Sequence, residues 1–305
     1  MFCGASPACD TDVESLRQRL TESNPILADG AMGTLLQSWG CRAGHCLELL
    51  NLDNPNLVWR AFEAYIQAGA EIVQTNTFGA SPLSLERWGL AAHCEDINAA
   101  AVRIARQAAG ESVWVVGSVG PSGRHLLPFG DLEPDQLAAS YHCQISTLLE
   151  AGVDAVNVET IMDVEEGVIA VRTARGIAPD MPVFASLTLS RAAGGYYTPF
   201  GNGLEQAIRR FEQADARVVG ANCSIGMSAM IEIAEKFAEL TALPLLMKPN
   251  AGLPMVRAGE TVWQEMPEQF AEGSKRLRDL GVRIIGGCCG TTPKHIQAMR
   301  KALRV

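Results

Sequence analysis

The sequence predicts an α/β protein that folds as a single-domain (β/α)8 TIM barrel. Two observations carry this prediction: eight short apolar runs rich in β-branched residues recur along the chain, and each is followed by a helical pattern. Alternating strands and helices require right-handed crossovers and a parallel sheet, which at eight repeats closes readily into a barrel. With 305 residues, of which 48% are hydrophobic, the chain is long and apolar enough to fill the core of such a barrel.

The predicted elements alternate regularly along the chain. We expect strands at residues 25–31, 71–78, 113–121, 154–160, 182–189, 218–224, 243–249 and 282–289. Amphipathic helical patterns occupy residues 56–69, 95–110, 137–152, 164–176, 204–214, 227–240, 267–281 and 293–303. Longer irregular stretches at residues 39–55, 122–134 and 191–202 each follow a strand, which places them on the rim at the C-terminal end of the barrel.

The last predicted helix has the clearest start signals. Thr292 is its expected N-cap and Pro293 its first residue, a position where proline is favoured. The apolar side chains of this helix share one face, and we expect His295 to face solvent instead.

An open, doubly wound sheet is the alternative architecture. The glycine-rich dinucleotide-binding fingerprint is absent after the first strand, because Asp29-Gly-Ala-Met-Gly-Thr34 has its glycines three residues apart and no acidic residue ends the second strand. No internal repeat or linker divides the chain. The sequence therefore predicts one barrel domain at residues 24–305, preceded by an N-terminal lead-in at residues 1–23.

Charge and cysteine content narrow the class of function. The 25 basic and 34 acidic residues give a net charge of −9 without a dense basic block, which argues against nucleic acid and membrane partners and favours a small molecule. The N-terminus lacks a signal-peptide pattern, and no apolar run approaches about 18 residues, so we expect a cytoplasmic protein. Nine scattered cysteines are an odd number and indicate reduced thiols.

Catalytic groups in TIM barrels lie where the strands end at the C-terminal rim. The predicted strands end at or just before Asp29, Thr75, Asn76, Thr77, Glu159, Asn222, Cys223, Lys248, Asn250, Cys288 and Cys289. The three cysteines could supply thiolates to a soft divalent metal such as zinc, which takes four ligands and keeps one position open in catalytic sites. The alternative is that they are small buried hydrophobic side chains, as free cysteines often are.

Five segments together resemble the homocysteine S-methyltransferase family, and most of all the homocysteine-binding module of cobalamin-dependent methionine synthase. They are Asp29-Gly-Ala-Met-Gly-Thr34, Thr75-Asn-Thr-Phe-Gly79, Asn222-Cys223, Pro249-Asn-Ala-Gly-Leu-Pro254 and Gly286-Gly-Cys-Cys-Gly-Thr-Thr-Pro293, in a resemblance that spans residues 24–304. This resemblance implies a barrel with one Zn²⁺ per chain, held by Cys223, Cys288 and Cys289. The thiolate of L-homocysteine would be the fourth ligand.

The same resemblance implies roles for three further residues. Glu159 would receive the amino group of homocysteine, Asp29 would line the substrate pocket, and Asn250 would approach the zinc ion when homocysteine is absent. Each residue also has a purely structural interpretation. Asp29 could cap the turn before Thr34, Glu159 could form a salt bridge with a basic neighbour, and Asn250 could be an ordinary turn residue.

The chemistry of three thiolate ligands agrees with alkyl transfer. A free thiol has a pKa of about 8.5 and is mostly protonated at neutral pH, whereas the thiolate is the nucleophile. Three anionic sulfurs around Zn²⁺ give a net charge of −1, which suits water activation poorly and leaves electron density on a bound substrate sulfur. The HExxH motif of zinc hydrolases is absent.

We therefore predict the methylation of L-homocysteine to methionine. Members of the family take the methyl group from methylcobalamin, S-methylmethionine or betaine. Residues 250–254 and 290–293 look most like the cobalamin-dependent branch, so a methyl-corrinoid, on a separate corrinoid protein or as free methylcobalamin, is the expected external donor. The alternatives are an S-methylmethionine-dependent or a betaine-dependent enzyme.

Two other classes of function remain open from the residues alone. Lys248 ends the seventh predicted strand and could form an imine in a Schiff-base lyase, and a non-catalytic subunit could hold homocysteine or a corrinoid partner. Cys41, His45 and Cys46 form a loop motif that lacks a fourth local metal ligand. Tyr196-Tyr197 could cover the mouth of the barrel or simply pack its own loop.

Overall fold

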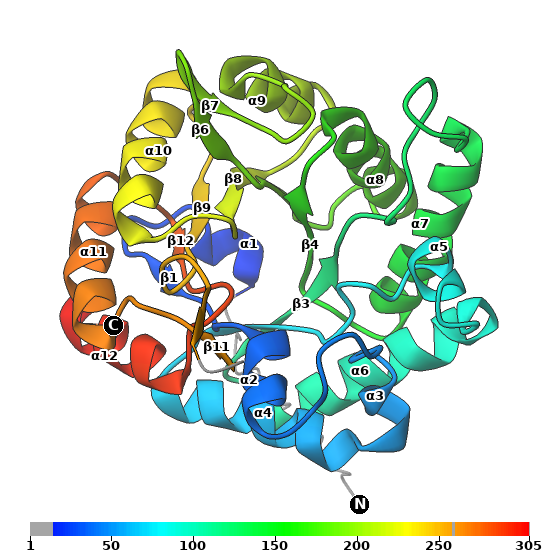
Figure 1. Cartoon of the computed structure of the whole chain (residues 1–305), viewed down its shortest axis with the longest axis horizontal. Coiled ribbons are helices and arrows are strands. Elements are labelled where there is room, and N and C mark those ends of the chain that lie inside the picture. The colour runs from blue at the N-terminus through cyan, green and yellow to red at the C-terminus, as the bar shows by residue number, and fades with distance from the viewer. Residues whose placement is uncertain (1–14, 258–259, 305) are drawn as a thin grey trace, which may run out of the picture.

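Eight parallel strands form a closed barrel ringed by helices in the computed structural model, which describes residues 15–257 and 260–304 (Figure 1). The strands are β1 (Ile26–Leu27), β2 (Ile72–Gln74), β3 (Trp114–Val119), β4 (Ala155–Ile161), β5 (Val183–Leu187), β8 (Val218–Asn222), β9 (Leu245–Lys248) and β12 (Ile284–Ile285). They pair in the order β1-β12-β9-β8-β5-β4-β3-β2, and a parallel bridge between Ala28 and Ile72 joins the two ends. The predicted TIM barrel is confirmed.

The helices follow the strands around the outside. They are α1 (Leu16–Arg19), α2 (Met32–Ser38), α3 (Leu50–Asp53), α4 (Pro55–Ala68), α5 (Pro82–Glu86), the 3₁₀ helix η1 (Ala91–His93), α6 (Cys94–Ala109), α7 (Pro134–Glu150), α8 (Val164–Ile177), α9 (Leu204–Gln213), α10 (Met227–Leu240), α11 (Pro267–Asp279) and α12 (Pro293–Leu303). In the described residues, no helix has the length and apolar character needed to cross a membrane.

Side chains of each strand alternate between the barrel interior and the helix layer, because successive residues of a strand point to opposite faces. The outward side chains, such as Val73 and Val156, pack with helix residues into one large core. Its largest fully buried apolar members include Phe62 and Phe211. Each fully buried apolar side chain of this size stabilises the fold by roughly 1.5–3 kcal/mol, so this layer holds the barrel together.

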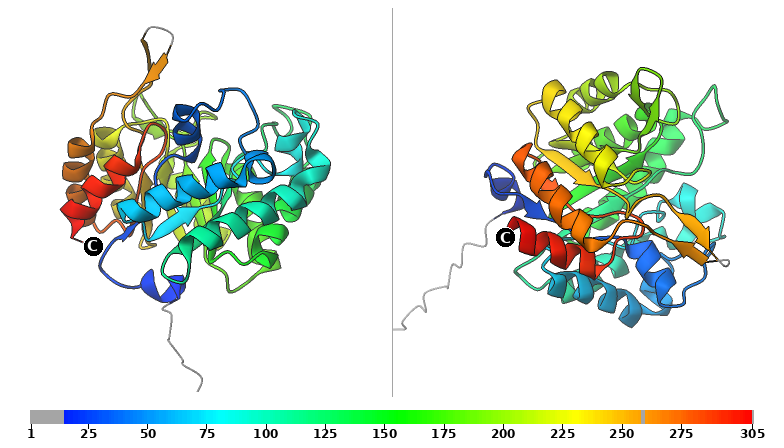
Figure 2. Two further views of the ribbon diagram at one scale, coloured as in Figure 1. Left: turned by 90° about the horizontal axis from the view of Figure 1, so that it is seen from below. Right: turned by 60° about the vertical axis from the view of Figure 1, so that its left-hand side comes forward.

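The interior of the barrel has an apolar floor and a polar upper layer. Residues near the N-terminal ends of the strands, including Phe184 and Leu246, form an apolar cluster with Leu16 and Leu20. Helix α1 thus closes this end of the barrel, as the left view of Figure 2 shows. The next inward-facing residues along the same strands are polar: Ser186 follows Phe184 by two positions, and Lys248 follows Leu246 by two. This change of character leaves the C-terminal end as the polar mouth.

The rim carries structure that the sequence did not predict. Residues 191–202 were expected to be irregular but include most of an antiparallel hairpin of β6 (Ser190–Ala192) and β7 (Gly195–Tyr197). A second hairpin, β10 (Met255–Arg257) with β11 (Glu260–Val262), projects from the same end of the barrel and is drawn in orange in Figure 2. The predicted strand at residues 282–289 is shorter than expected and contains only Ile284–Ile285.

Helix α12 confirms the predicted cap but corrects the placement of His295. Thr292 is the N-cap and Pro293 begins the helix. The expectation that His295 faces solvent was wrong, because its side chain is buried. Its Nδ1 accepts a hydrogen bond from the Thr292 backbone N–H at 3.1 Å, and its Nε2 lies 3.0 Å from the Glu265 carbonyl oxygen. His295 therefore completes the helix cap and ties it to a neighbouring loop.

Candidate metal and substrate site

A cavity of about 380 Å³ opens at the C-terminal ends of the strands. It brings together side chains that are separated by up to 260 positions in the sequence. The predicted site residues in its lining are Asp29, Glu159, Cys223, Lys248, Cys288 and Cys289. Asn250 is not in this lining but hydrogen-bonds to Cys223 from the loop after β9. The predicted residues therefore belong to a single site.

The three cysteine sulfurs form a compact cluster. Cys223 directly follows β8, and Cys288 and Cys289 follow β12. All three Sγ atoms lie within 4.8 Å of one another, and those of Cys223 and Cys289 are 3.8 Å apart. Among the side chains that the structure describes, this is the only group of three or more cysteine, histidine or carboxylate side chains gathered so closely. The geometry suits a single metal ion with three sulfur ligands.

An unusual backbone conformation directs Cys223 into the cluster. Cys223 and Ser224 both have positive φ angles, 64° and 62°, which non-glycine residues adopt at a cost of about 1–3 kcal/mol each. The surrounding hydrogen bonds maintain this turn. The backbone N–H of Cys223 donates to the Lys248 carbonyl at 3.1 Å, and that of Ile225 donates to the Cys223 carbonyl at 2.8 Å. Strained residues held in this way are typical of functional sites.

The loop after β12 places the other two cysteines. The backbone N–H of Cys288 donates to the Pro249 carbonyl at 2.7 Å, and that of Gly287 donates to the Asp29 carbonyl at 3.0 Å. Gly287 has no space for a side chain, because a Cβ atom there would lie 2.4 Å from the Oγ1 atom of Thr291. The loop thus turns away from the sheet immediately after Ile285 and presents both thiols to the pocket.

The sulfur cluster favours a thiolate at Cys223. Hydrogen bonds from the Cys288 and Cys289 thiols lower the pKa of Cys223, and together they outweigh the opposing effect of burial. The same interactions raise the pKa of Cys288. The side-chain oxygen of Asn250 is buried without a hydrogen-bond partner, although the Asn250 side chain contacts Cys223. Three sulfurs and one unpartnered oxygen form a donor set that fits a zinc ion.

Glu159 lies in the same pocket on a distorted part of β4. The register between β4 and β5 shifts between Val158 and Ile161, and Thr160 has a φ angle of 59°. Its carboxylate accepts hydrogen bonds from Gln74 Nε2 at 2.5 Å, Ser118 Oγ at 2.5 Å and Asn222 Nδ2 at 3.3 Å. Burial raises the pKa of Glu159. Neutral side chains rather than a basic one bind this carboxylate, so it can still accept a cation.

Asp29 and Lys248 form an ion pair in the wall of the pocket. Lys248 Nζ lies 2.8 Å from Asp29 Oδ1 and also donates to Gln74 Oε1. The other oxygen of Asp29 accepts the Gln74 backbone N–H at 2.7 Å. Asp29 therefore does not cap the turn before Thr34, and Gln74 links this ion pair to Glu159.

Sequence reasoning missed Gln74 and Ser118. Neither residue type is distinctive, and both lie inside predicted strands rather than at their ends. Their positions could have identified them. Gln74 lies two residues after Ile72 and Ser118 lies two residues after Val116. Ile72 and Val116 point into the barrel, and residues two apart in a strand point to the same side.

Other predicted features lie outside this pocket. Cys41, His45 and Cys46 line a separate cavity of about 540 Å³. The Tyr196 hydroxyl donates to Glu232 on α10 at 2.7 Å, which favours packing of the loop against this helix. The Phe200 ring lies 6.1 Å from that of Phe129, so two rim loops contact each other beside the mouth.

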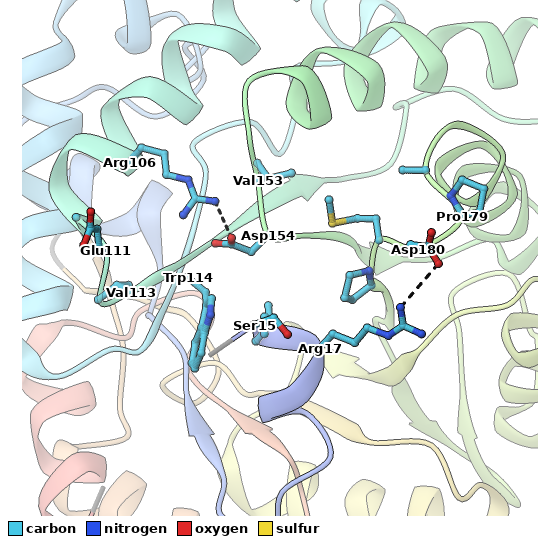
Figure 3. A pocket seen from close by; sticks show the side chains of 15 residues that line it. Ser15, Arg17, Arg106, Glu111, Val113, Trp114, Val153, Asp154, Pro179 and Asp180 are labelled. Atoms are coloured by element: carbon cyan, nitrogen blue, oxygen red, sulfur yellow. Dashed lines mark ion pairs between the residues drawn. The ribbon is translucent and has the colours of Figure 1, made fainter. Parts of the chain in front are cut away.

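A larger cavity, of about 860 Å³, lies at the opposite end of the barrel beside the starts of β3, β4 and β5. Figure 3 shows four of its charged side chains in two ion pairs, Arg106 with Asp154 at 2.8 Å and Arg17 with Asp180 at 3.8 Å. Its described lining contains no cysteine or histidine. We therefore select the candidate site by its buried charges and sulfurs, which lie at the mouth, and not by cavity size.

Comparison with known proteins agrees with this geometry. The family model described as homocysteine S-methyltransferase matches residues 26–303. The chain is 31% identical over 312 residues to methionine synthase of Mycobacterium leprae and 30% identical to that of Mycobacterium tuberculosis. These matches cover 96% of this chain but only 25% of each methionine synthase. The metallated form of the homocysteine methyltransferase MmuM from Escherichia coli superimposes with a TM-score of 0.78 at 27% identity, covering 94% of this chain and 99% of that one.

Proposed function

The chain belongs to the homocysteine S-methyltransferase family, and from this premise we propose that its barrel, residues 24–305, transfers a methyl group to the sulfur of L-homocysteine and forms methionine. The observation that carries this proposal is the position of the three-sulfur cluster. It lies in the same pocket as Glu159, a buried carboxylate whose hydrogen-bond partners are all neutral. Homocysteine carries a thiol at one end and an amino group at the other. A metal held by the sulfur cluster would bind the thiol, and the Glu159 carboxylate would bind the amino group.

We assign the sulfur cluster to one Zn²⁺ per chain, with Cys223, Cys288 and Cys289 as ligands and the Asn250 side-chain oxygen as a donor in the absence of substrate. Bound there, zinc would hold the homocysteine sulfur as a thiolate at neutral pH, which is the form that accepts a methyl group. The described cysteines are all free, as metal binding requires. A reducing compartment such as the cytoplasm would keep them so.

The pocket charges support the proposed orientation of the substrate. When ionised, Asp29, Glu159 and Lys248, which Gln74 links through hydrogen bonds, carry a net charge of −1, so this group holds one negative charge without a cationic partner. Asp29 already forms an ion pair with Lys248. We therefore assign the ammonium contact to Glu159 and place Asp29 in the pocket wall. A charge-assisted hydrogen bond of this kind contributes about 1.5–3 kcal/mol.

We propose a methyl-corrinoid as the donor, supplied by a separate protein or as free methylcobalamin. The resemblance of residues 250–254 and 290–293 to the cobalamin-dependent branch of the family supports this choice. S-methylmethionine and betaine are the alternative donors.

A donor panel tests the proposal. Zinc-loaded protein is incubated with L-homocysteine and, in separate reactions, a methyl-corrinoid protein, free methylcobalamin, S-methylmethionine or betaine, and methionine is measured by mass spectrometry. We expect methionine with a methyl-corrinoid and none from the matched Cys289→Ala variant. Tight homocysteine binding without methionine from any donor would instead indicate a non-catalytic binding subunit.

A further inference from the structure

Two cysteines outside the metal cluster lie almost in bonding contact. Cys94 is the first residue of α6 and Cys143 lies in the middle of α7, two helices that are neighbours in the outer ring (Figure 1). Their Sγ atoms are 3.0 Å apart although the residues are 49 positions apart in the chain. Both are free thiols in this structure.

The surroundings of the two thiols hold them in place. Cys94 belongs to a small apolar cluster with Ala80, Leu85 and Ile97, and the Cys143 side chain packs against it. Asn98 donates to the Cys94 carbonyl at 2.7 Å and contacts its sulfur at 3.6 Å. A disulfide bond is about 2.05 Å long, so the two sulfurs need to approach by only about 1 Å.

We propose that Cys94 and Cys143 form a dithiol site that a low-molecular-weight disulfide, such as glutathione disulfide, oxidises to an intramolecular disulfide. This proposal does not depend on the methyl transfer reaction, because neither cysteine lines the pocket at the barrel mouth.

Unequal exposure of the two thiols sets the order of the steps. Cys94 is only 2% exposed, whereas Cys143 is half-buried and accessible to a small oxidant. The Cys143 thiolate attacks one sulfur of glutathione disulfide, which forms a mixed disulfide and releases one glutathione thiolate. The Cys94 thiolate then attacks the Cys143 sulfur and expels the second glutathione. The two cysteines lose two electrons, glutathione disulfide gains them, and the two thiol protons pass to the released thiolates.

The dithiol also lies close to the loop that supports the pocket. The Asn98 side chain that contacts Cys94 also donates to the Ala80 carbonyl at 2.9 Å. Ala80 ends the segment of residues 75–80, of which Thr77 and Phe78 line the pocket. The cross-link would therefore fix the end of α6 that anchors this loop.

Peptide mapping tests the proposal on the full, metal-loaded chain. The protein is equilibrated in glutathione buffers of increasing disulfide content, its free thiols are alkylated, and it is digested with trypsin. Cleavage after arginine yields residues 88–103 and 125–172, and each of these peptides contains one cysteine, Cys94 or Cys143. We expect the cross-linked pair of peptides to replace the two alkylated peptides in oxidising buffer and to disappear on treatment with dithiothreitol.

Three variants distinguish this disulfide from unspecific oxidation. Cys143→Ser should abolish the cross-link, and Cys94→Ser should retain a glutathione adduct on Cys143 because the second thiol is missing. Cys46→Ser, which removes a third thiol beside the same apolar cluster, should leave the cross-link unchanged. Recovery of both peptides in alkylated form at the most oxidising ratio, or a cross-link from Cys143 to Cys46 instead, would overturn the proposal.

Discussion

Lys248 Nζ lies 2.8 Å from Asp29 Oδ1, and the two side chains are 5% and 3% exposed. Burial on its own lowers the pKa of Lys248, but the Asp29 and Glu159 carboxylates raise it above its usual value. Lys248 therefore remains protonated at neutral pH, whereas an imine-forming lysine needs a free amine. The ion pair therefore argues against a Schiff-base lyase. It indicates that Lys248 neutralises Asp29 in the pocket wall.

Removal of one member of this pair should destabilise the protein strongly. Lys248→Met leaves the Asp29 carboxylate buried without its cation, and we expect a loss of about 3–5 kcal/mol in the free energy of unfolding, measured in urea. The double variant Asp29→Asn/Lys248→Met should recover much of this loss because it removes both charges. As a control, Lys236→Met breaks an exposed pair with Glu239 and should cost less than about 1 kcal/mol. Equal losses in the single and double variants would contradict this account.

Replacement of a cluster cysteine should remove metal and activity together. Cys289→Ala takes one of three sulfur donors from the proposed zinc site, in which the substrate is the proposed fourth ligand. We therefore expect less than stoichiometric zinc after dialysis and no methionine formation. Cys41→Ala is the matched control, because Cys41 is a half-buried free thiol outside the cluster. Zinc content by atomic absorption and methionine yield are measured on the same samples. Full activity in metal-free Cys289→Ala would refute the zinc mechanism.

Substitution of Glu159 should weaken substrate binding without loss of zinc. Glu159→Gln removes the proposed charge-assisted contact with the homocysteine ammonium, worth about 1.5–3 kcal/mol or roughly 10- to 150-fold in affinity. The variant should also discriminate less against 4-mercaptobutyrate, which lacks the amino group. Calorimetric titration with both thiols measures the two effects.

A second buried glutamate provides the control for Glu159. Glu166 accepts hydrogen bonds from the Ser122 backbone at 2.7 Å and from the Tyr141 hydroxyl at 2.9 Å, away from the pocket. Glu166→Gln should therefore change stability but leave homocysteine affinity close to that of the parent. If Glu159→Gln binds homocysteine as tightly as the parent does, the carboxylate is structural and the proposed substrate orientation is wrong.

The barrel and its cysteines were predictable because their signals are local. Each strand and helix has its own hydrophobic period, and the C-terminal ends of parallel strands must converge on one rim. This is why Cys223 and Cys288, 65 positions apart, could be placed in one cluster. The end of the last strand was less predictable. The Gly286 and Cys288 backbone N–H groups donate to Met247 and Pro249 in a turning loop, and the residue types alone do not reveal this.

Contacts between distant, ordinary residues were not predictable. Gln74 is an unremarkable strand residue until the fold brings it between Lys248 and Glu159. The same holds for Cys94 and Cys143, whose approach depends on how two helices pack in the outer ring. The pattern of His295 among apolar neighbours indicated a solvent-facing residue. Its burial results from the adjacent loop with Glu265 and from the Phe270 ring on α11, whose centroid lies 5.0 Å from that of the imidazole.

Burial of His295 should make the protein less stable in mild acid. Its Nδ1 accepts a hydrogen bond from Thr292 and its Nε2 faces the Glu265 carbonyl, an arrangement that requires the neutral ring with its proton on Nε2. Burial lowers the pKa of His295 below its usual value of 6.5, and this effect exceeds those of the Glu265 carbonyl and the Glu268 carboxylate, which raise it. The unfolded chain consequently binds more protons than the folded chain as the pH falls through 6.5. The contribution of neutral His295 to stability is thus complete above this pH and decreases below it.

The variant His295→Gln tests this pH dependence, because glutamine at the third helical position can still form the capping box with Thr292. We expect the free energy of unfolding of the parent to fall more steeply than that of the variant between pH 7.5 and 5.5, measured in urea at each pH. The other histidines are present in both proteins, so the difference between the two curves reports His295 alone. Parallel curves would show that His295 titrates alike in the folded and unfolded chains, which would contradict the buried, neutral ring.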